Sequence, residues 1–94
     1  MAHKPPQKAR RDGNEPEVFA ALRAHGLAVE PTDKPLDAIV AYSDRTALVE
    51  VKNGPKAPLT KDQKVFLAEW PGEAVVIRSV DEAIAFAEKI RGAK

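Results

Sequence analysis

The sequence predicts a single α/β domain, with a mixed sheet of about four strands flanked by helices in the order α-β-β-β-α-β-α. Its length of 94 residues and its apolar fraction of 44% suffice for one packed core but not for two. Three segments space their apolar residues as helices do, and shorter apolar runs lie between them. In the second half a strand, a helix and a strand follow one another, which predicts a right-handed crossover between parallel strands.

The first two predicted elements are a helix over residues 16–25 and a weak strand over residues 27–30. Pro16 suits the first turn of a helix, because its missing N–H has no helical partner there. Gly26 fits the position just after a helix C-terminus. Pro31 is expected to stop the weak strand.

The clearest strand signal is a predicted hairpin of residues 37–42 and 46–52. Both segments are rich in small and branched apolar residues, and the polar turn Ser43-Asp44-Arg45 separates them. Asn53-Gly54-Pro55 ends the second segment. The pattern therefore predicts two antiparallel neighbours.

The next predicted element is a helix over residues 61–70, which Pro71-Gly72 ends. Thr60 and Gln63 have the spacing of a capping box, in which side chains and main-chain N–H groups at the helix start bond reciprocally. Four residues of this helix share one face: Gln63, Phe66, Leu67 and Trp70.

The last two predicted elements are a short buried strand over residues 74–77 and a helix over residues 80–90. Ser79 and Glu82 predict a second capping box at the start of that helix. The strand over residues 46–52 should run parallel to the strand over residues 74–77, because a helix connects them.

Charge divides the chain into a flexible basic arm, residues 1–11, and a single domain, residues 12–94. The arm carries four basic residues and no acid, whereas the domain carries 14 acidic and 11 basic residues. Such an arm either contacts nucleic acid, since cations displace counterions from phosphates, or is a solubilising tail. The chain has no cysteine, no membrane-length apolar segment and no apolar signal region, which predicts a soluble cytoplasmic protein.

The residues that indicate chemistry are Asp37, Glu50 and Lys52. If the hairpin turn is centred between Asp44 and Arg45, Asp37 lies opposite Lys52. Glu50 and Lys52 are two residues apart and therefore share a face of their strand. The pattern predicts two carboxylates and one amine at one end of the sheet.

Such a cluster is typical of a site that hydrolyses phosphodiester bonds. Close carboxylates repel one another unless a cation lies between them. Two acidic oxygens and a backbone carbonyl suit a hard ion such as Mg²⁺, which also binds substrate phosphate. Lys52 would hold the attacking water or neutralise charge in the transition state. The alternative is a surface charge pair, since Glu-x-Lys occurs on many exposed strands; the apolar strands favour a buried site.

At these residues the chain resembles a known family. Asp37 followed by Glu50-Val51-Lys52 resembles the signature of the PD-(D/E)XK nucleases, and its context is similar to the compact VRR-NUC branch of phage and bacterial proteins. The family often has Gly-x-Pro-Asp before the first strand of the hairpin; here Lys34-Pro35-Leu36-Asp37 places the proline one residue earlier. The resemblance spans roughly residues 12–86 and includes three further segments: Asn14-Glu15-Pro16-Glu17, Leu22-Arg23-x-x-Gly26, and Leu59-Thr60-x-x-Gln63 before a helix bearing Trp70.

The resemblance implies a restriction-endonuclease-like core and Mg²⁺- or Mn²⁺-dependent endonuclease activity on structured DNA by a homodimer. It implies that Asp37, Glu50 and the backbone carbonyl of Val51 bind the metal. Glu15 is an alternative to Glu17 as the acid of the first helix, where an acid also suits the helix dipole. The five catalytic positions that it implies are Glu17, Asp37, Glu50, Lys52 and Gln63.

The remaining polar residues carry weaker signals. His3 and His25 have no metal-binding partner nearby in the sequence, and His25 suits the C-terminal end of a helix. Lys56, Lys61 and Lys64 follow the lysine motif and either meet phosphates or form a solvated helix face. No serine or cysteine triad and no phosphate-binding glycine loop is present.

The functional expectation is an endonuclease that hydrolyses DNA, selects branched or junction structures, and works in the cytoplasm of a bacterium or a phage-infected cell. One alternative is a catalytically inactive nucleic-acid-binding module with the same fold. Another is an interaction protein without affinity for nucleic acid. Loss of metal-dependent cleavage with retained binding would favour the first alternative, and a flat salt dependence of binding would favour the second.

Overall fold

The computed structural model describes residues 13–92, and there the predicted fold class and element order are confirmed; the predicted basic arm lies outside them. No helix among the described residues is long and apolar enough to cross a membrane. The elements are α1 (Glu15–Ala24), β1 (Ala28–Pro31), β2 (Ala38–Tyr42), β3 (Arg45–Val51), α2 (Lys61–Glu69), β4 (Ala74–Ile77) and α3 (Val80–Ile90).

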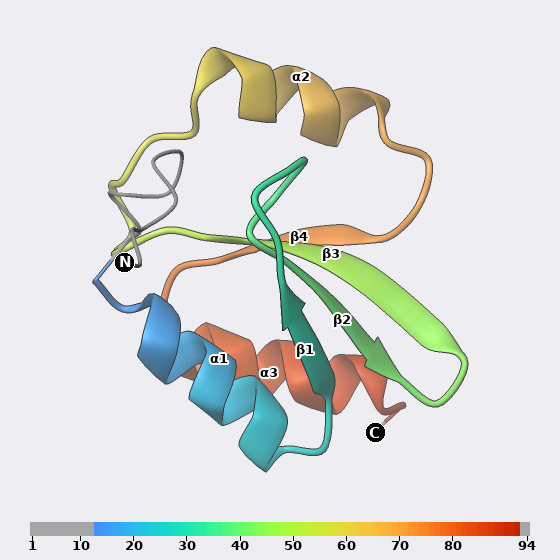
Figure 1. Cartoon of the computed structure of the whole chain (residues 1–94). Helices are drawn as coiled ribbons and strands as arrows, with labels where there is room; N and C mark the ends of the chain where they lie inside the picture. Colours follow the sequence, from blue (N-terminus) through green and yellow to red (C-terminus); the bar gives the residue numbers. More distant parts are fainter. Residues whose placement is uncertain (1–12, 93–94) are drawn as a thin grey trace, which may run out of the picture.

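The four strands form one mixed sheet in the order β1-β2-β3-β4. The pairs β1–β2 and β2–β3 are antiparallel, and β3–β4 is parallel, as the crossover through α2 requires. Figure 1 shows α1 and α3 side by side against one face of the sheet and α2 across the other. Helices thus lie on both faces of the sheet.

The main core lies between the sheet and the helices α1 and α3. Alternate strand residues point to it, so Val49 and Val51 are buried there while Glu50 between them faces α2. Burying one such aliphatic side chain contributes about 1.5–3 kcal/mol to folding. Seven members of this core larger than alanine have at most 1% of their surface exposed: Val18, Leu22, Val40, Val49, Val51, Ile77 and Ile90.

The face of the sheet toward α2 is packed less completely than the sequence predicts. No residue of α2 is buried, and Trp70 directly after it is 42% exposed. Ile39, on the strand face below, is 39% exposed. Leu36 is only 1% exposed but does not belong to the main core. The strands are therefore fully covered on the α1 and α3 side, whereas toward α2 the sheet is only partly covered.

The hairpin turn is shorter than predicted. Tyr42 pairs with Arg45, so only Ser43 and Asp44 connect the strands, and Ser43 has φ 57°. Two-residue turns with positive φ match the twist of the flanking strands. As a result β3 begins one residue earlier than expected and Ala38 faces Val49.

Two helix starts also differ in detail from the prediction. The helix α1 begins at Glu15, one residue before Pro16. At α3, Ser79 Oγ accepts from the Glu82 N–H at 3.1 Å, as in a capping box. The Glu82 carboxylate, however, accepts from the N–H of Arg78 at 2.8 Å, one residue before the expected donor. Both ends of this cap still satisfy main-chain donors.

Two proline and glycine positions complete the comparison. Pro31 is the last residue of β1 and does not stop the strand before it, because β1 is an edge strand that tolerates a missing donor. Gly26 has φ 95° just after α1, as a C-terminal glycine does. The helix itself ends at Ala24, with His25 as its cap.

Candidate active site

Asp37 is held against the end of β3 by two hydrogen bonds. Its N–H donates to the carbonyl of Val49 at 2.9 Å, and its Oδ2 accepts from the N–H of Val51 at 2.8 Å. Asp37 therefore lies beside Glu50 and not opposite Lys52, so the predicted pairing is wrong by two residues. A shift of two residues keeps the side chains on the same face, which is why the predicted grouping survives.

The loop before β2 fixes the position of Asp37. Thr32 bonds across it twice, from its N–H to the Asp37 carbonyl at 2.8 Å and from its hydroxyl to the Leu36 carbonyl at 2.6 Å. Leu36 anchors the loop because its side chain is buried. Asp37 itself is only 5% exposed. The first acid of the site is thus presented by a short, internally bonded loop.

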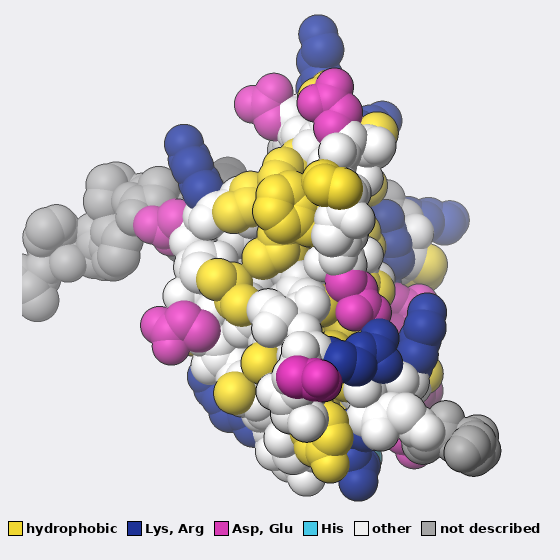
Figure 2. All heavy atoms as spheres, turned by 90° about the vertical axis from the view of Figure 1, so that its right-hand side faces the viewer, with side chains coloured by type: hydrophobic (Ala, Val, Ile, Leu, Met, Phe, Trp, Pro, Cys, Tyr) yellow, Lys and Arg dark blue, Asp and Glu magenta, His cyan; other side chains and the backbone are white. Residues whose placement is uncertain are grey.

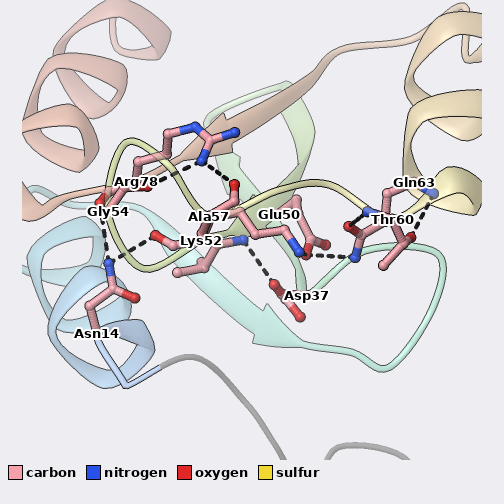
Figure 3. Close-up of polar contacts among 10 residues, drawn as sticks. Asn14, Asp37, Glu50, Lys52, Gly54, Ala57, Thr60, Gln63 and Arg78 are labelled. Carbon is pink, nitrogen blue, oxygen red and sulfur yellow. Dashed lines mark hydrogen bonds and ion pairs between the residues drawn. The ribbon is translucent and has the colours of Figure 1, made fainter.

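Glu50 and Lys52 form the centre of the cluster, as the two-residue spacing predicts. Lys52 Nζ lies 3.5 Å from Glu50 Oε2, and the two side chains are 12% and 4% exposed. Gln63 Nε2 donates to the same oxygen at 2.8 Å. Figure 3 shows Asp37, Glu50, Lys52 and Gln63 converging from a loop, a strand and a helix. Burial of charge at this density is costly unless the charges are paired and hydrogen-bonded.

Gln63 combines the two roles that the sequence left as alternatives. Its N–H donates to Thr60 Oγ1 at 3.1 Å and its Oε1 accepts from the Thr60 N–H at 2.9 Å, which completes the capping box of α2. Its Nε2 is the group that bonds Glu50. The amide therefore uses its oxygen for the helix start and its nitrogen for the site.

Asn14 ties the start of α1 to the end of β3, a role that sequence reasoning missed. Its Nδ2 donates to the carbonyl of Lys52 at 3.0 Å and to the carbonyl of Arg78 at 3.3 Å. This explains why Asn14 occupies the N-cap position of α1 without a capping hydrogen bond. An asparagine before a helix is usually taken for a cap, so its type gave no signal of a long-range contact.

Arg78 is a second residue that the sequence gave no reason to single out. It follows β4 and its Nη1 donates to the carbonyls of Gly54 at 3.1 Å and Ala57 at 2.6 Å. The N–H of Gly54 in turn donates to the Arg78 carbonyl at 3.2 Å. Arg78 thereby holds the loop that follows Lys52, and with Asn14 it fixes the main chain from Lys52 to Ala57 (Figure 3).

The two candidate acids of α1 lie in different surroundings. Glu15 is 5% exposed and directly follows Asn14, which bonds the carbonyl of Lys52. Glu17 is exposed and lines a surface groove together with Asn14, Asn53 and Arg78. Burial therefore distinguishes Glu15 from Glu17.

The donor set at this site fits a hard divalent ion by its chemistry. Asp37 and Glu50 supply carboxylate oxygens, the ligands that Mg²⁺ prefers. In a strand the N–H and carbonyl of one residue point to the same neighbour, so the carbonyl of Val51, whose N–H bonds Asp37, lies on the same side. Among residues 13–92, no three His, Cys, Asp or Glu side chains are grouped to hold a metal. An ion here would complete its shell with water, and when bound it supplies Lewis acidity.

The other polar residues that the sequence singled out lie on the surface or at helix ends. His25 Nδ1 is 3.0 Å from the carbonyl of Ala21 at the end of α1, as expected for a cap. Lys56, Lys61 and Lys64 are exposed, and none has an ion pair among those found in the described part of the chain. His3 lies outside the described residues.

Comparisons of the chain with models of known protein families, with curated proteins and with solved structures gave no match. The resemblance to the PD-(D/E)XK nucleases therefore stays a prediction from the sequence.

Proposed function

We propose that the protein is a metal-dependent endonuclease that hydrolyses phosphodiester bonds in DNA. The observation that carries the proposal is the buried contact of Glu50 with Lys52 and Gln63, beside an equally buried Asp37. A structural ion pair does not need a second buried carboxylate next to it, since like charges raise the cost of burial. A divalent cation would supply positive charge to the two carboxylates and would also bind the phosphate of a substrate.

The roles of the residues follow from their contacts. Lys52 carries a positive charge into the site and would stabilise the negative charge that develops on the attacked phosphate. Gln63 fixes the rotamer of Glu50 through the 2.8 Å bond. The loop 32–37 positions Asp37, and Asn14 positions the main chain of Lys52. Such preorganisation matters because small displacements of reacting groups cost large factors in rate.

The substrate that we propose is DNA recognised by its backbone and shape, including branched DNA. A chain of 94 residues offers little surface for reading a long base sequence. A homodimer would present two such sites to a duplex or a junction. The proposed location is the cytoplasm of a bacterium or a phage-infected host, where such DNA is found.

The test compares the wild-type protein with Lys52→Ala on linear, nicked, flapped and four-way-junction DNA, with Mg²⁺, Mn²⁺ or EDTA. We expect metal-dependent cleavage by the wild type and a loss of roughly 100- to 1,000-fold in the variant, the effect of removing one charge-stabilising group. Arg23→Ala, an exposed cation on α1, is the matched control and should cut normally. Equal rates for wild type and Lys52→Ala, or binding without any cleavage, would refute the proposal.

A second comparison decides which acid of α1 belongs to the site. We expect Glu15→Gln to lower the cleavage rate at least tenfold, since Glu15 is buried next to the residue that bonds Lys52. Glu17→Gln should retain activity, because Glu17 is exposed. Circular dichroism of both variants controls for folding. A larger loss of cleavage rate in Glu17→Gln than in Glu15→Gln would instead assign Glu17 to the site.

A further inference from the structure

An apolar groove lies on the same face of the sheet as the candidate active site. It has a volume of about 410 Å³, in the range of small-molecule sites, and its lining includes Pro35, Ile39, Leu48 and Trp70. Figure 2 shows hydrophobic side chains gathered in the upper part of the face on which this groove opens. Among the described residues, Ile39 and Trp70 are two of three large apolar side chains that are more than a third exposed. The groove thus concentrates exposed apolar surface.

The groove lies farther along β3 from the cluster of charged residues, on the same face of the sheet. Leu48 precedes Glu50 by two residues on the same face of β3, a separation of about 6.6 Å along a strand. Pro35 lines the groove and also a polar pocket that contains Gln63, the partner of Glu50. A ligand whose phosphate lies beside Glu50 can therefore place an attached group over Leu48.

The aromatic wall of the groove is held in place from two sides. The Trp70 ring stacks on Phe66, with centroids 5.1 Å apart and planes inclined by 25°. On the main chain that follows, a Cβ at Gly72 would lie 2.8 Å from Trp70 Nε1, so only a glycine lets the indole approach so closely. The ring is therefore preorganised although Trp70 is 42% exposed.

The acid at the rim of the groove is compensated. Glu73 belongs to the lining, and both of its carboxylate oxygens accept from Arg45 Nη2 at 3.2 Å. Arg45 is fixed in turn by the carbonyls at the end of α3, at Lys89 and Ile90. A polyanion that approaches the groove therefore meets a paired acid.

We infer that this groove binds an unpaired nucleobase of the DNA strand whose phosphodiester lies at Glu50 and Lys52; the inference rests on the proposed nuclease function. Planar bases stack on exposed aromatic rings irrespective of their sequence. The groove is lined by eight residues, whereas a stable subunit interface takes about 20–30 residues from each side. It is therefore suited to one flat ring next to the site and is small for a second copy of the chain. The substrate class is DNA with an unpaired nucleotide beside the cleaved bond.

The test uses the single tryptophan of the chain as a reporter. The full-length protein is titrated with an oligothymidylate of 12 nucleotides and with an abasic strand of equal length and charge. Ca²⁺ or EDTA is present to prevent cleavage. We expect quenching of Trp70 fluorescence only by the strand that carries bases. The affinity for that strand should exceed the affinity for the abasic strand by roughly 5- to 150-fold.

Variants separate base binding from contacts with the backbone. Trp70→Ala should abolish the preference for bases in a fluorescence-anisotropy assay with labelled strands, and Trp70→Phe should retain most of it. Gly72→Ala should weaken it, because the new methyl group displaces the ring. Val65→Ala changes an exposed apolar residue of α2 outside the groove and serves as the matched control.

Three outcomes would overturn the inference. They are equal affinity of the wild type for both strands, a base preference that survives in Trp70→Ala, and a dimer in sedimentation that Trp70→Ala dissociates without any change in base binding. Cleavage assays report on the nuclease function separately. If metal-dependent cutting fails while the base preference holds, the proposed function is wrong and the groove still binds bases.

Discussion

The two faces of the sheet differ in how they are packed. Against α1 and α3 the strands present Val40, Val49 and Val51, each at most 1% exposed. On the opposite face, toward α2, the same strands present Ile39, which is 39% exposed, and Glu50, which is buried among polar groups. Because strand residues alternate, one segment supplies a dry core and a polar site at once.

The difference indicates that one face of the sheet stabilises the fold and the other carries the candidate active site. The face against α1 and α3 contributes most of the hydrophobic stabilisation, since apolar burial scales with the area removed from water. The face toward α2 is left incompletely filled and carries charges that oppose burial. Functional sites in stable domains are typically less favourable for stability than the rest of the structure.

The largest expected effect separates the two faces by their contribution to stability. Leu22→Ala removes a fully buried side chain of α1 and should lower the free energy of unfolding by about 2–5 kcal/mol. Leu67→Ala changes a half-buried residue of α2 and should cost about 1 kcal/mol. Urea denaturation followed by circular dichroism measures both values. Equal losses of unfolding free energy would mean that α2 packs on the sheet as tightly as α1 and α3 do.

The next effect concerns the charges on the face toward α2. Asp37→Asn keeps an oxygen that can accept from the Val51 N–H but removes one of two neighbouring negative charges. Relief of like-charge repulsion should leave stability unchanged or raise it by about 0.5–2 kcal/mol. Cleavage should fall at least 100-fold because a proposed metal ligand is lost.

Thermal unfolding and cleavage rates are measured on the same preparation of Asp37→Asn. Asp44→Asn, an exposed acid of the hairpin turn, is the control for a change of charge and should alter neither quantity. A clear loss of stability with normal cleavage would make Asp37 a structural residue and remove the contrast between the faces.

The sequence was most informative where a repeating pattern governs the structure. The periods of helices and strands predicted all seven elements, and the crossover rule predicted the parallel pair β3–β4. The two-residue spacing placed Glu50 and Lys52 on one face. The pairing of Asp37 was wrong because it depended on the length of the turn, and Ser43-Asp44 alone makes that turn.

The rest depends on contacts between segments that no local pattern encodes. Asn14 has the residue type and place of a helix cap, yet it bonds the carbonyls of Lys52 and Arg78, which lie 38 and 64 residues away. Arg78 bonds the loop after β3 through a side chain that nothing in its neighbourhood distinguishes. Nor does periodicity report how closely a helix approaches a sheet, so the exposure of Trp70 was not foreseen.

The smallest expected effect concerns Gln63, whose side chain both caps α2 and bonds Glu50. Thr60→Ala removes the hydroxyl that accepts from the Gln63 N–H, but the main-chain N–H of Thr60 still donates to Gln63 Oε1. It should therefore cost about 1 kcal/mol of stability and leave the cleavage rate unchanged. Gln63→Ala loses the acceptor for the Thr60 N–H and the bond to Glu50 together, although the main-chain N–H of residue 63 still donates to the Thr60 hydroxyl. It should cost a similar free energy and also slow cleavage about tenfold.

The ratio of cleavage rates for these two variants isolates the contribution of Gln63 to the site, because each variant loses one of the two reciprocal bonds of the capping box. Gln63→Glu sharpens the comparison: it preserves the acceptor for the Thr60 N–H but replaces the amide donor with a charge that repels Glu50. Its rate should fall below that of Gln63→Ala while α2 remains capped. If Thr60→Ala and Gln63→Ala cut equally fast, Gln63 only caps α2. In that case β3 and the loop 32–37 alone position the residues of the candidate active site.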